Sequence, residues 1–217
     1  MRIALIHALK HSIVPIEDAF ARLWPSARLA NLLDDSLSAD LARDGALTPA
    51  MTERFLTLAR YAKSSGADGI LFTCSAFGPC IEACARELAP MPVLKPNEAM
   101  IEDALVRVGP KGRVGLLATF APTLDSMPPE FAAAAPGITL VPKLAEGAMA
   151  ALDRGDTATH DRAAVDAALA LRDCDAIALG QFSLARAAHA IGTATGRPVL
   201  TTPDSAVNKL KCLLGEN

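Results

Sequence analysis

The sequence predicts an α/β protein made of two similar lobes, and three features of the chain support this fold class. Short β-like runs alternate with longer helical stretches along all 217 residues. Runs such as "GILF" lack polar alternation, which is typical of parallel strands covered by helices on both faces. The pattern also restarts near the middle of the chain. An alternation of this kind calls for parallel sheets with right-handed crossovers.

The chain before residue 97 is expected to hold four strands and three helices. The helix after Thr48 has the clearest signal, because Thr48 is a favoured N-cap, Pro49 suits a first turn and apolar residues recur at helical spacing. The strands are expected at 2–9, 27–35, 68–74 and 91–96, the second including its exit loop with Asp34 and Asp35. The helices are expected at 15–25, 48–66 and 79–89.

The remainder of the chain is expected to repeat this order. A helix at 97–109 leads to a strand at 112–120 that echoes the opening "MRIALIHAL". The elements expected next are a helix at 128–135, a strand at 138–143, a helix at 160–173, a strand and helix within 174–192, and a strand and helix within 197–214. The last helix, from about Ser205, is expected to pack back on the first lobe.

An internal repeat relates the two halves. Laying "ADGILFTCSAFGPCIEA" over "CDAIALGQFSLARAAHA" pairs Asp68 with Asp175 and Cys74 with Gln181, and "PVLKPNEAM" then lies over "PVLTTPDSAV". Two matches in the same order favour a duplication. The prediction is therefore two pseudo-symmetric α/β lobes, each a parallel β-sheet flanked by helices, with an interlobe cleft. The first lobe comprises 1–96 plus 205–217, and the second comprises 97–204.

Composition excludes several classes of function. The formal net charge is −3, no Lys/Arg cluster occurs and only 4% of residues are aromatic, so we expect neither a nucleic-acid nor a membrane partner. The apolar start is too short for a signal peptide, which indicates a cytoplasmic protein. Five cysteines are expected to be reduced there. Cys80 and Cys84 lack the partners of a metal site and are expected in the core, so no metal is predicted.

The chemistry is expected at the carboxyl ends of the strands, where open parallel α/β sheets bind ligands. There "GILFTCSAFGP" brings Cys74 from a buried strand into a turn that precedes a helix. A helix N-terminus favours a thiolate and binds carboxylates, and the N–H groups of Ser75 and Ala76 are natural anion donors. From position alone, Cys74 is either such a functional thiol or a small buried residue.

A family resemblance bears on this choice. The segments "FTCSAFG", "GLLAT…T", "LGQ" and "PVLTTP" together resemble the aspartate/glutamate/hydantoin racemase superfamily, which also holds arylmalonate decarboxylases and maleate cis–trans isomerases. The resemblance implies two lobes with the site between them and no cofactor. It also implies that Cys74 is the first-lobe cysteine of a pair whose thiols stand on opposite sides of the substrate's α-carbon.

The second-lobe cysteine of these racemases ends a strand in "LGC", whereas this chain reads "LGQ" and places Gln181 there. A carboxamide hydrogen-bonds but has no usable acid–base function near neutral pH. We therefore predict an enzyme acting on a small carboxylate such as an amino acid or diacid, with Cys74 as the proton-transfer or nucleophilic group. Decarboxylation and cis–trans isomerisation with one cysteine stay open, although the decarboxylases of the superfamily carry theirs in the second lobe.

Other polar residues are expected near these strand ends. The resemblance places Thr119 and Thr123 where the family binds a carboxylate, although both are also ordinary helix caps. His7 ends the first strand and is either a proton-transfer group or a structural histidine. Asn97 either reaches the cleft or starts a helix, and His160 is expected on a helix surface. Besides the catalytic pair Cys74 and Gln181, the predicted substrate-binding residues are His7, Ser75, Ala76, Asn97, Thr119, Thr123 and Phe182.

A competing class is a non-catalytic protein that binds a small carboxylate in the same cleft. Loss of the second cysteine is compatible with it. The sequence leaves the identity of the substrate open, and for the oligomeric state it offers a homodimer only as one option.

Overall fold

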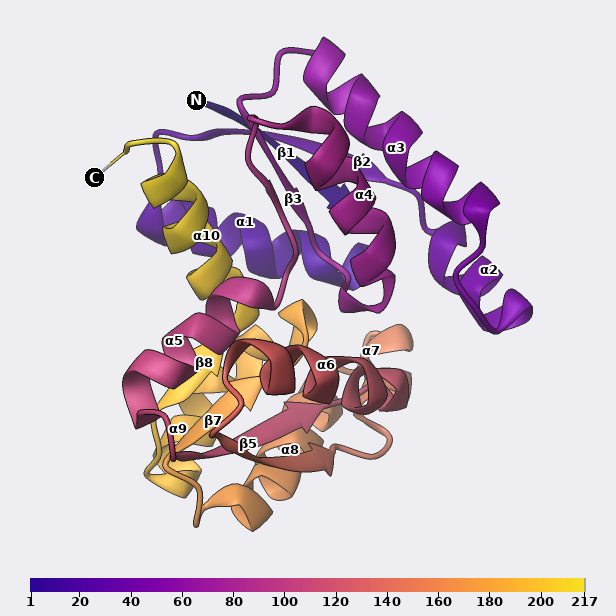
Figure 1. Cartoon of the computed structure of the whole chain (residues 1–217). Helices are drawn as coiled ribbons and strands as arrows, with labels where there is room; N and C mark the ends of the chain where they lie inside the picture. The colour runs from indigo at the N-terminus through magenta and orange to yellow at the C-terminus, as the bar shows by residue number, and fades with distance from the viewer. Residues whose placement is uncertain (217) are drawn as a thin grey trace. The chain divides into compact units, whose positions relative to one another are not determined.

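The computed structural model describes residues 1–216, and the chain divides into two compact units (Figure 1). The first unit consists of Met1–Pro96 and the described residues from Ala206 on, and the second unit is Asn97–Ser205. Each unit holds one four-stranded parallel sheet flanked by helices. The α/β class and the two parallel sheets predicted from the sequence are confirmed. The cleft between the lobes stays a prediction.

The sheet of the first unit has the order β2-β1-β3-β4. Its strands are β1 (Arg2–His7), β2 (Arg28–Leu33), β3 (Gly69–Phe72) and β4 (Val93–Leu94). Its helices are the 3-10 turn η1 (Lys10–Ser12), α1 (Ile13–Leu23), α2 (Ser36–Asp44), α3 (Pro49–Ser64), the 3-10 turn η2 (Ser75–Phe77) and α4 (Gly78–Leu88). As predicted, Thr48 caps α3 by accepting the Met51 N–H at 3.2 Å.

The core of the first unit forms because alternate side chains of β1 and β3 enter opposite faces of the sheet. On one face Ile6 and Phe72 pack with Phe55 of α3 and Cys80 and Ile81 of α4. Figure 1 shows α3 and α4 on that face and α1 with α10 (Thr202–Leu213) on the other. The end of α10 packs closely there, since a Cβ on Gly69 would lie 3.1 Å from the side chain of Leu210.

The sheet of the second unit repeats this order as β6-β5-β7-β8. Its strands are β5 (Arg113–Ala118), β6 (Thr139–Leu144), β7 (Ala176–Leu179) and β8 (Val199–Thr201). Its helices are α5 (Glu98–Val108), α6 (Ala121–Ala134), α7 (Ala148–Asp153), α8 (Thr157–Ala168), the 3-10 turns η3 (Leu169–Leu171) and η4 (Phe182–Ala187), and α9 (Ala188–Thr195). One face of this sheet packs on α5 and α6, and the other packs on α7, α8 and α9.

Equivalent hydrogen bonds recur in the two units and support the internal repeat. The N–H of Arg2 donates to the carboxylate of Asp68 at 2.7 Å, and the N–H of Arg113 donates to Asp175 at 2.8 Å. The first residue after β3, Thr73, donates its N–H to the carbonyl of Ile6 in β1. In the second unit the first residue after β7, Gly180, likewise donates its N–H to the carbonyl of Leu117 in β5. The sequence alignment that pairs Cys74 with Gln181 therefore matches the backbone as well.

Two short helices, α2 and α7, were not predicted, and α6 begins seven residues earlier than expected. Helices this short are marginal alone and depend on packing, as in α2, where Leu37 is fully buried. Helix α6 was expected only around the segment "PPEFAAAA", residues 128–135. The structure instead begins this helix at Ala121 and carries Pro128 and Pro129 inside it.

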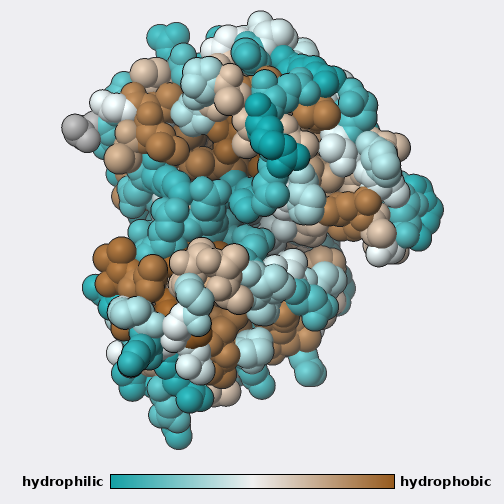
Figure 2. Space-filling model, in the orientation of Figure 1, coloured by the Kyte–Doolittle hydropathy of each residue, from teal (hydrophilic) through white to brown (hydrophobic). Residues whose placement is uncertain are grey.

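The surface hydropathy, the cysteines and the possible metal ligands also bear on the expectations from the sequence. On the face seen in Figure 2, hydrophilic and hydrophobic residues are interspersed over each unit. Within residues 1–216, no helix is both long and apolar enough to cross a membrane. The five cysteines form no disulfide, and Cys80 and Cys84 are buried as expected. No set of three His, Cys, Asp or Glu side chains suited to a metal ion occurs in the described part of the chain.

The dependence of α2 on packing gives a first prediction. Replacing Leu37 by Ala removes a fully buried side chain and should lower the free energy of unfolding by about 2–5 kcal/mol. The measurement is urea denaturation followed by circular dichroism. Val14→Ala, at a side chain that is 64% exposed in the same unit, should change it by less than about 0.5 kcal/mol. Equal effects of the two substitutions would contradict the packing role.

Candidate active site

The register of the first sheet brings three polar residues to one edge. β1 pairs with β3 so that Ile6 lies beside Phe72, and both strands end within one residue of this pair. His7, Thr73 and Cys74 therefore all leave the sheet at its carboxyl edge. The backbone of Cys74 is extended, with φ −130° and ψ 121°, and the 3-10 turn η2 separates it from α4.

Cys74 is a partly buried thiol at this edge. Burial raises its pKa to about 11, and a hydrogen bond from the backbone N–H of Ala76 opposes this rise only in part. The expectation that the helix start would favour a thiolate is therefore wrong for the free protein, because desolvation outweighs the backbone donor. Ala76 does direct its N–H at the sulfur, and near neutral pH Cys74 carries its proton.

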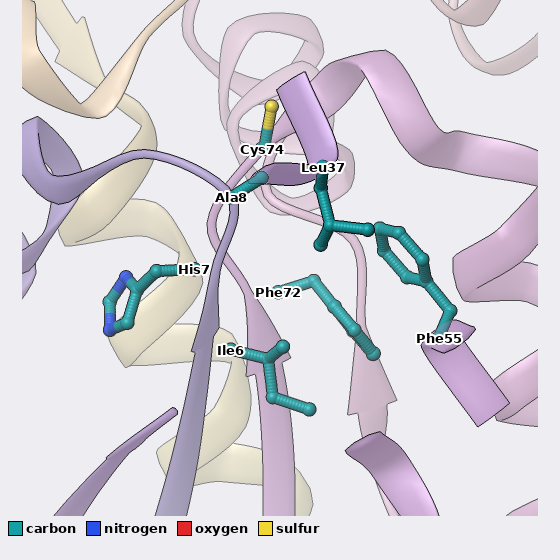
Figure 3. Close-up of a pocket in the computed structure, with 7 residues that line it drawn as sticks. All are labelled: Ile6, His7, Ala8, Leu37, Phe55, Phe72 and Cys74. Carbon is teal, nitrogen blue, oxygen red and sulfur yellow. The ribbon is translucent and has the colours of Figure 1, made fainter. Parts of the chain in front are cut away.

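A small apolar pocket lies beside Cys74 (Figure 3). Its lining side chains come from β1, α2, α3 and the end of β3, and they are Ile6, Ala8, Leu37, Phe55 and Phe72, with His7 and Cys74. Figure 3 shows the His7 ring pointing away from the other lining side chains. Cys74 thus adjoins hydrocarbon and aromatic side chains on this side, while in Figure 3 its sulfur points away from Ile6, Phe55 and Phe72.

His7 is fully buried and both of its ring nitrogens have partners. Its Nε2 lies 3.0 Å from Oδ1 of Asn31, and its Nδ1 lies 2.9 Å from Oγ1 of Thr73 and 3.0 Å from Oγ of Ser12. Because the amide oxygen of Asn31 only accepts, Nε2 carries the proton and Nδ1 accepts. Ser12 donates its own hydroxyl to the carbonyl of Leu9 at 2.8 Å, so the Thr73 hydroxyl is the donor to Nδ1.

This network makes His7 a neutral histidine linked to the residue before Cys74. Burial lowers its pKa, while the hydrogen bond of Asn31 and the nearby charge of Glu17 act in the opposite direction. Asn31 in turn donates to Glu17 at 2.7 Å. The geometry suits a histidine that orients Thr73. The prediction that His7 binds substrate stays untested.

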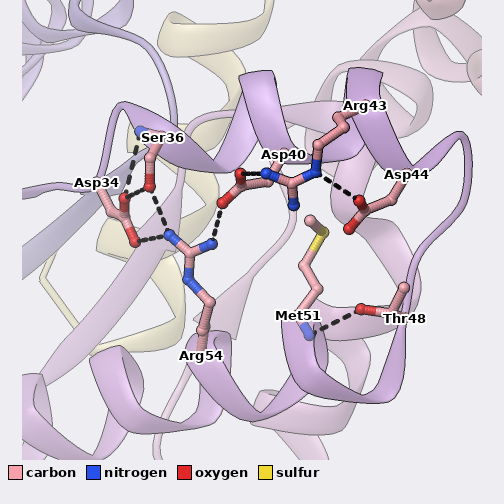
Figure 4. A network of polar contacts seen from close by, with 8 residues as sticks. All are labelled: Asp34, Ser36, Asp40, Arg43, Asp44, Thr48, Met51 and Arg54. Carbon is pink, nitrogen blue, oxygen red and sulfur yellow. Dashed lines mark hydrogen bonds and ion pairs between the residues drawn. The ribbon is translucent and has the colours of Figure 1, made fainter.

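The guanidinium of Arg54 in α3 is engaged by acids of its own unit (Figure 4). Arg54 of α3 contacts Asp34 and Asp40, each at 2.5 Å, and also bonds Ser36. Burial alone would raise the pKa of Asp34, but the hydrogen bonds from Ser36 and Arg54 outweigh it and lower that pKa. Arg54 therefore anchors α2 to α3.

In the second unit, Gln181 occupies the position that corresponds to Cys74. Its Oε1 accepts hydrogen bonds from the N–H of Thr119 at 2.5 Å, from the hydroxyl of Thr119 at 3.0 Å and from the N–H of Phe120 at 3.1 Å. These donors lie at the end of β5, directly before α6. The carboxamide oxygen thus occupies the donors that were expected to bind a substrate carboxylate.

The other predicted site residues are placed as follows. Thr123 is buried and lies against Gly180, and Phe182 is buried at the start of η4. Ser75 and Ala76 are half-buried in η2. Asn97 precedes α5 without a side-chain capping bond, and its Nδ2 is buried without a partner in residues 1–216. Whether any of these residues contacts substrate, and whether Cys74 and Gln181 face each other, stays a prediction.

His160 was expected on a helix surface, and this was wrong. It is fully buried in α8, with its Nδ1 2.8 Å from Oδ1 of Asp161, which also pairs with Arg186. Burial of this face of α8 by α7 and η4 explains the difference, because α7 itself was not predicted.

Sequence reasoning missed the residues that surround His7 and the thiol. Ser12, Asn31 and Thr73 are polar residues in or beside apolar strands, and this was the signal available for them. Leu37 belongs to the pocket through the unpredicted α2. Phe120 contributes a backbone N–H, which any residue type would supply, so no sequence signal exists for it.

Comparison with known proteins identifies the family of this chain. Residues 16–210 match the family model described as Asp/Glu/hydantoin racemase. The chain belongs to this family. A search of curated proteins gave no match.

Solved structures share the fold of this racemase-family chain. Aspartate racemase of Picrophilus torridus aligns with a TM-score of 0.75 at 14% identity, over 100% of this chain and 95% of that one. Glutamate racemase RacE1 of Bacillus anthracis aligns with a TM-score of 0.73 at 15% identity, over 98% and 81%. An arylmalonate decarboxylase aligns with a TM-score of 0.66 at 23% identity, over 99% and 93%. At these identities the likeness shows the fold alone, and the family supports a racemase-like enzyme.

The raised pKa of Cys74 predicts slow alkylation near neutral pH. At pH 8 only about one Cys74 in a thousand should be thiolate, because its pKa is about 11. The rate of Cys74 modification by iodoacetamide, measured by peptide mass spectrometry, should therefore keep rising up to about pH 10. The exposed Cys212 in the same samples checks the reagent. A Cys74 rate that levels off below pH 8.5 would contradict the burial argument.

The lowered pKa of His7 predicts acid sensitivity. Below about pH 6.5 the unfolded chain binds a proton at His7 that the folded chain does not, so the free energy of unfolding falls as pH decreases toward the folded pKa. The limiting slope for one such proton is about 1.4 kcal/mol per pH unit. The free energy of unfolding, measured by urea denaturation, should therefore fall less steeply between pH 6.5 and pH 5 in the His7→Gln variant than in the wild-type protein. Identical slopes in both proteins would rule out a contribution of His7.

Proposed function

We propose that this racemase-family chain transfers a proton at the carbon next to the carboxylate of a small acid, with Cys74 as the acid–base group. The observation that carries the proposal is the position of Cys74. Its partly exposed thiol stands at the carboxyl edge of the first sheet, beside an apolar pocket. Strand ends of this kind are where parallel α/β proteins place their ligands.

The chemistry is one-sided in this proposal. A racemase needs one group to remove a proton and a second group to return it on the other face. The residue that corresponds to Cys74 in the second unit is Gln181, and a carboxamide does not titrate near neutral pH. The protein should therefore handle a proton on a single face of the substrate carbon.

The protonation state of Cys74 favours the proton-donating half of such a reaction and raises a second candidate, decarboxylation. In a malonate-type acid, the bond between the α-carbon and one carboxylate breaks, CO₂ leaves and the electron pair stays as an enolate. The Cys74 S–H then protonates that carbon, and solvent returns a proton to the thiolate. A thiol with a pKa of about 11 holds the required proton at neutral pH.

The surroundings of the thiol support an acid that carries an apolar group. Five of the pocket-lining residues are aliphatic or aromatic: Ile6, Ala8, Leu37, Phe55 and Phe72. Arg54 of α3 is paired with Asp34 and Asp40. The five apolar side chains are buried core that excludes water, so a second charged group of the substrate would be desolvated beside Cys74, and an acid whose other substituent is apolar suits this edge better.

The competing hypothesis is a protein that binds a small carboxylate without catalysing a reaction, and an enzyme assay distinguishes it from the proposed enzyme. The absence of a cofactor requirement, a cytoplasmic location and a homodimer stay predictions from the sequence.

The test is proton exchange in D₂O followed by NMR, with a panel of amino acids, diacids and monosubstituted malonates. The wild-type protein should exchange or deliver one proton on one face, giving deuterated product of a single configuration. At a saturating concentration of the substrate acid, Gln181→Cys should introduce racemisation by supplying a thiol in the second lobe. Cys74→Ser should reduce the rate by at least about 100-fold, the low end of the contribution of a positioned acid–base group.

Two outcomes would contradict the proposal. Full racemisation by the unmodified protein would point to a second acid–base group. Saturable binding with no exchange or decarboxylation of any tested acid would favour the non-catalytic class. Cys212→Ser, at an exposed cysteine, is the matched control and should leave the rate unchanged.

A further inference from the structure

The side chain of Gln181 is held in one orientation by the start of α6. Two backbone N–H groups and one hydroxyl, from Thr119 and Phe120, converge on a single atom of its carboxamide, at 2.5, 3.0 and 3.1 Å. Backbone N–H groups only donate, so the atom that they contact is the oxygen and not the NH₂ group. The polarity of the carboxamide is therefore determined by its contacts.

The backbone around Gln181 supports this arrangement. A Cβ at Gly180 would lie 3.0 Å from Sδ of Met127 and 3.1 Å from Cγ2 of Thr123, both in α6. Glycine thus allows the end of β7 to approach α6 closely. This approach brings the next residue, Gln181, within reach of the N–H groups that precede the helix.

With its oxygen engaged, Gln181 offers only donors to a ligand. Its Nε2 carries two N–H bonds and has no hydrogen-bond partner within residues 1–216, and the residue is partly exposed. An N–H pair of this kind matches the oxygen acceptors of a carboxylate. It offers nothing to an ammonium group, which also only donates.

We infer that Gln181 is a specificity-determining residue that binds a carboxylate oxygen of the substrate through Nε2, and that Thr119 is a positioning residue that acts through it. The inference rests on the proposed function, because it assigns the group that holds the small acid in the second unit. It also changes the expected role of Thr119. The hydroxyl and N–H of Thr119 bind the oxygen of Gln181 and not the substrate itself.

Gln181→Glu tests the assignment with an almost isosteric change. One carboxylate oxygen keeps the three donors, so the thermal unfolding midpoint should not fall, while the Nε2 group that has no partner is replaced by a negatively charged acceptor. The dissociation constant for malonate, measured by isothermal titration calorimetry at pH 7.5, should rise at least about tenfold, since a hydrogen bond to a charged group is lost and like charges repel.

Thr119 supplies a matched pair of variants. Thr119→Val removes the hydroxyl and keeps both backbone donors, so it should loosen the carboxamide and raise the malonate dissociation constant about two- to tenfold. Thr119→Ser keeps the hydroxyl and should restore wild-type binding. A merely structural role of Thr119 would lower the unfolding midpoint in Thr119→Val without this change in binding.

The outcomes separate the two proposals. Wild-type protein that binds malonate, together with a Gln181→Glu variant that binds it equally well, overturns the role of Gln181 and leaves the proposed function standing. Wild-type protein that binds neither malonate nor any acid of the panel overturns both. Malonate binding that weakens in Gln181→Glu and Thr119→Val but not in Thr119→Ser is the expected result.

Discussion

The two inner strands of each sheet, β1 with β3 and β5 with β7, are covered by helices on both faces, and this constraint determines where polar chemistry can lie. Nearly all of their side chains are apolar and buried, as in Ile70, Leu71 and Phe72. Their backbone groups are satisfied by parallel ladders on both sides. A polar side chain inside such a layer loses its water and therefore needs a partner, as His7 at the end of β1 has in Thr73 and Asn31. The candidate residues Cys74 and Gln181 lie just after the strands, where this constraint is weaker.

The repeat supplies the same backbone twice and then diverges in side chains. Both units tie the start of the first strand to an aspartate, Asp68 or Asp175, and in both units two residues lead from the third strand to a 3-10 turn, the second of them being the N-cap of that turn. In the first unit that residue is a thiol, with His7 behind it. In the second unit it is a carboxamide bound to the start of α6. The equivalent positions therefore have different chemical capacity, although their local geometry is alike.

Two effects act in opposite directions on the pKa of Cys74. The backbone N–H of Ala76 stabilises a thiolate and lowers the pKa, whereas burial removes the water that would stabilise the thiolate more and raises the pKa. Desolvation is the larger effect, and the sulfur keeps its proton. Burial among the apolar side chains at this edge thus keeps the Cys74 thiol protonated near neutral pH.

The sequence by itself determined the α/β class, the parallel sheets, the internal repeat and the positions of Cys74 and Gln181 after equivalent strands. It could do so because periodicity and local turn signals are encoded in neighbouring residues. It also indicated the racemase family through short motifs such as "FTCSAFG". Only the tertiary structure decided that Leu37 of α2 lines the pocket beside Cys74, that the His7 ring has Ser12, Thr73 and Asn31 as hydrogen-bond partners, and that the oxygen of Gln181 accepts from Thr119 and Phe120. These are contacts between residues 24 to 66 positions apart, or a few positions apart around a turn, and they depend on which side chains lose water together. Burial and hydrogen-bond partners, which set the charge of a thiol and the polarity of an amide, exist only once the strands are paired.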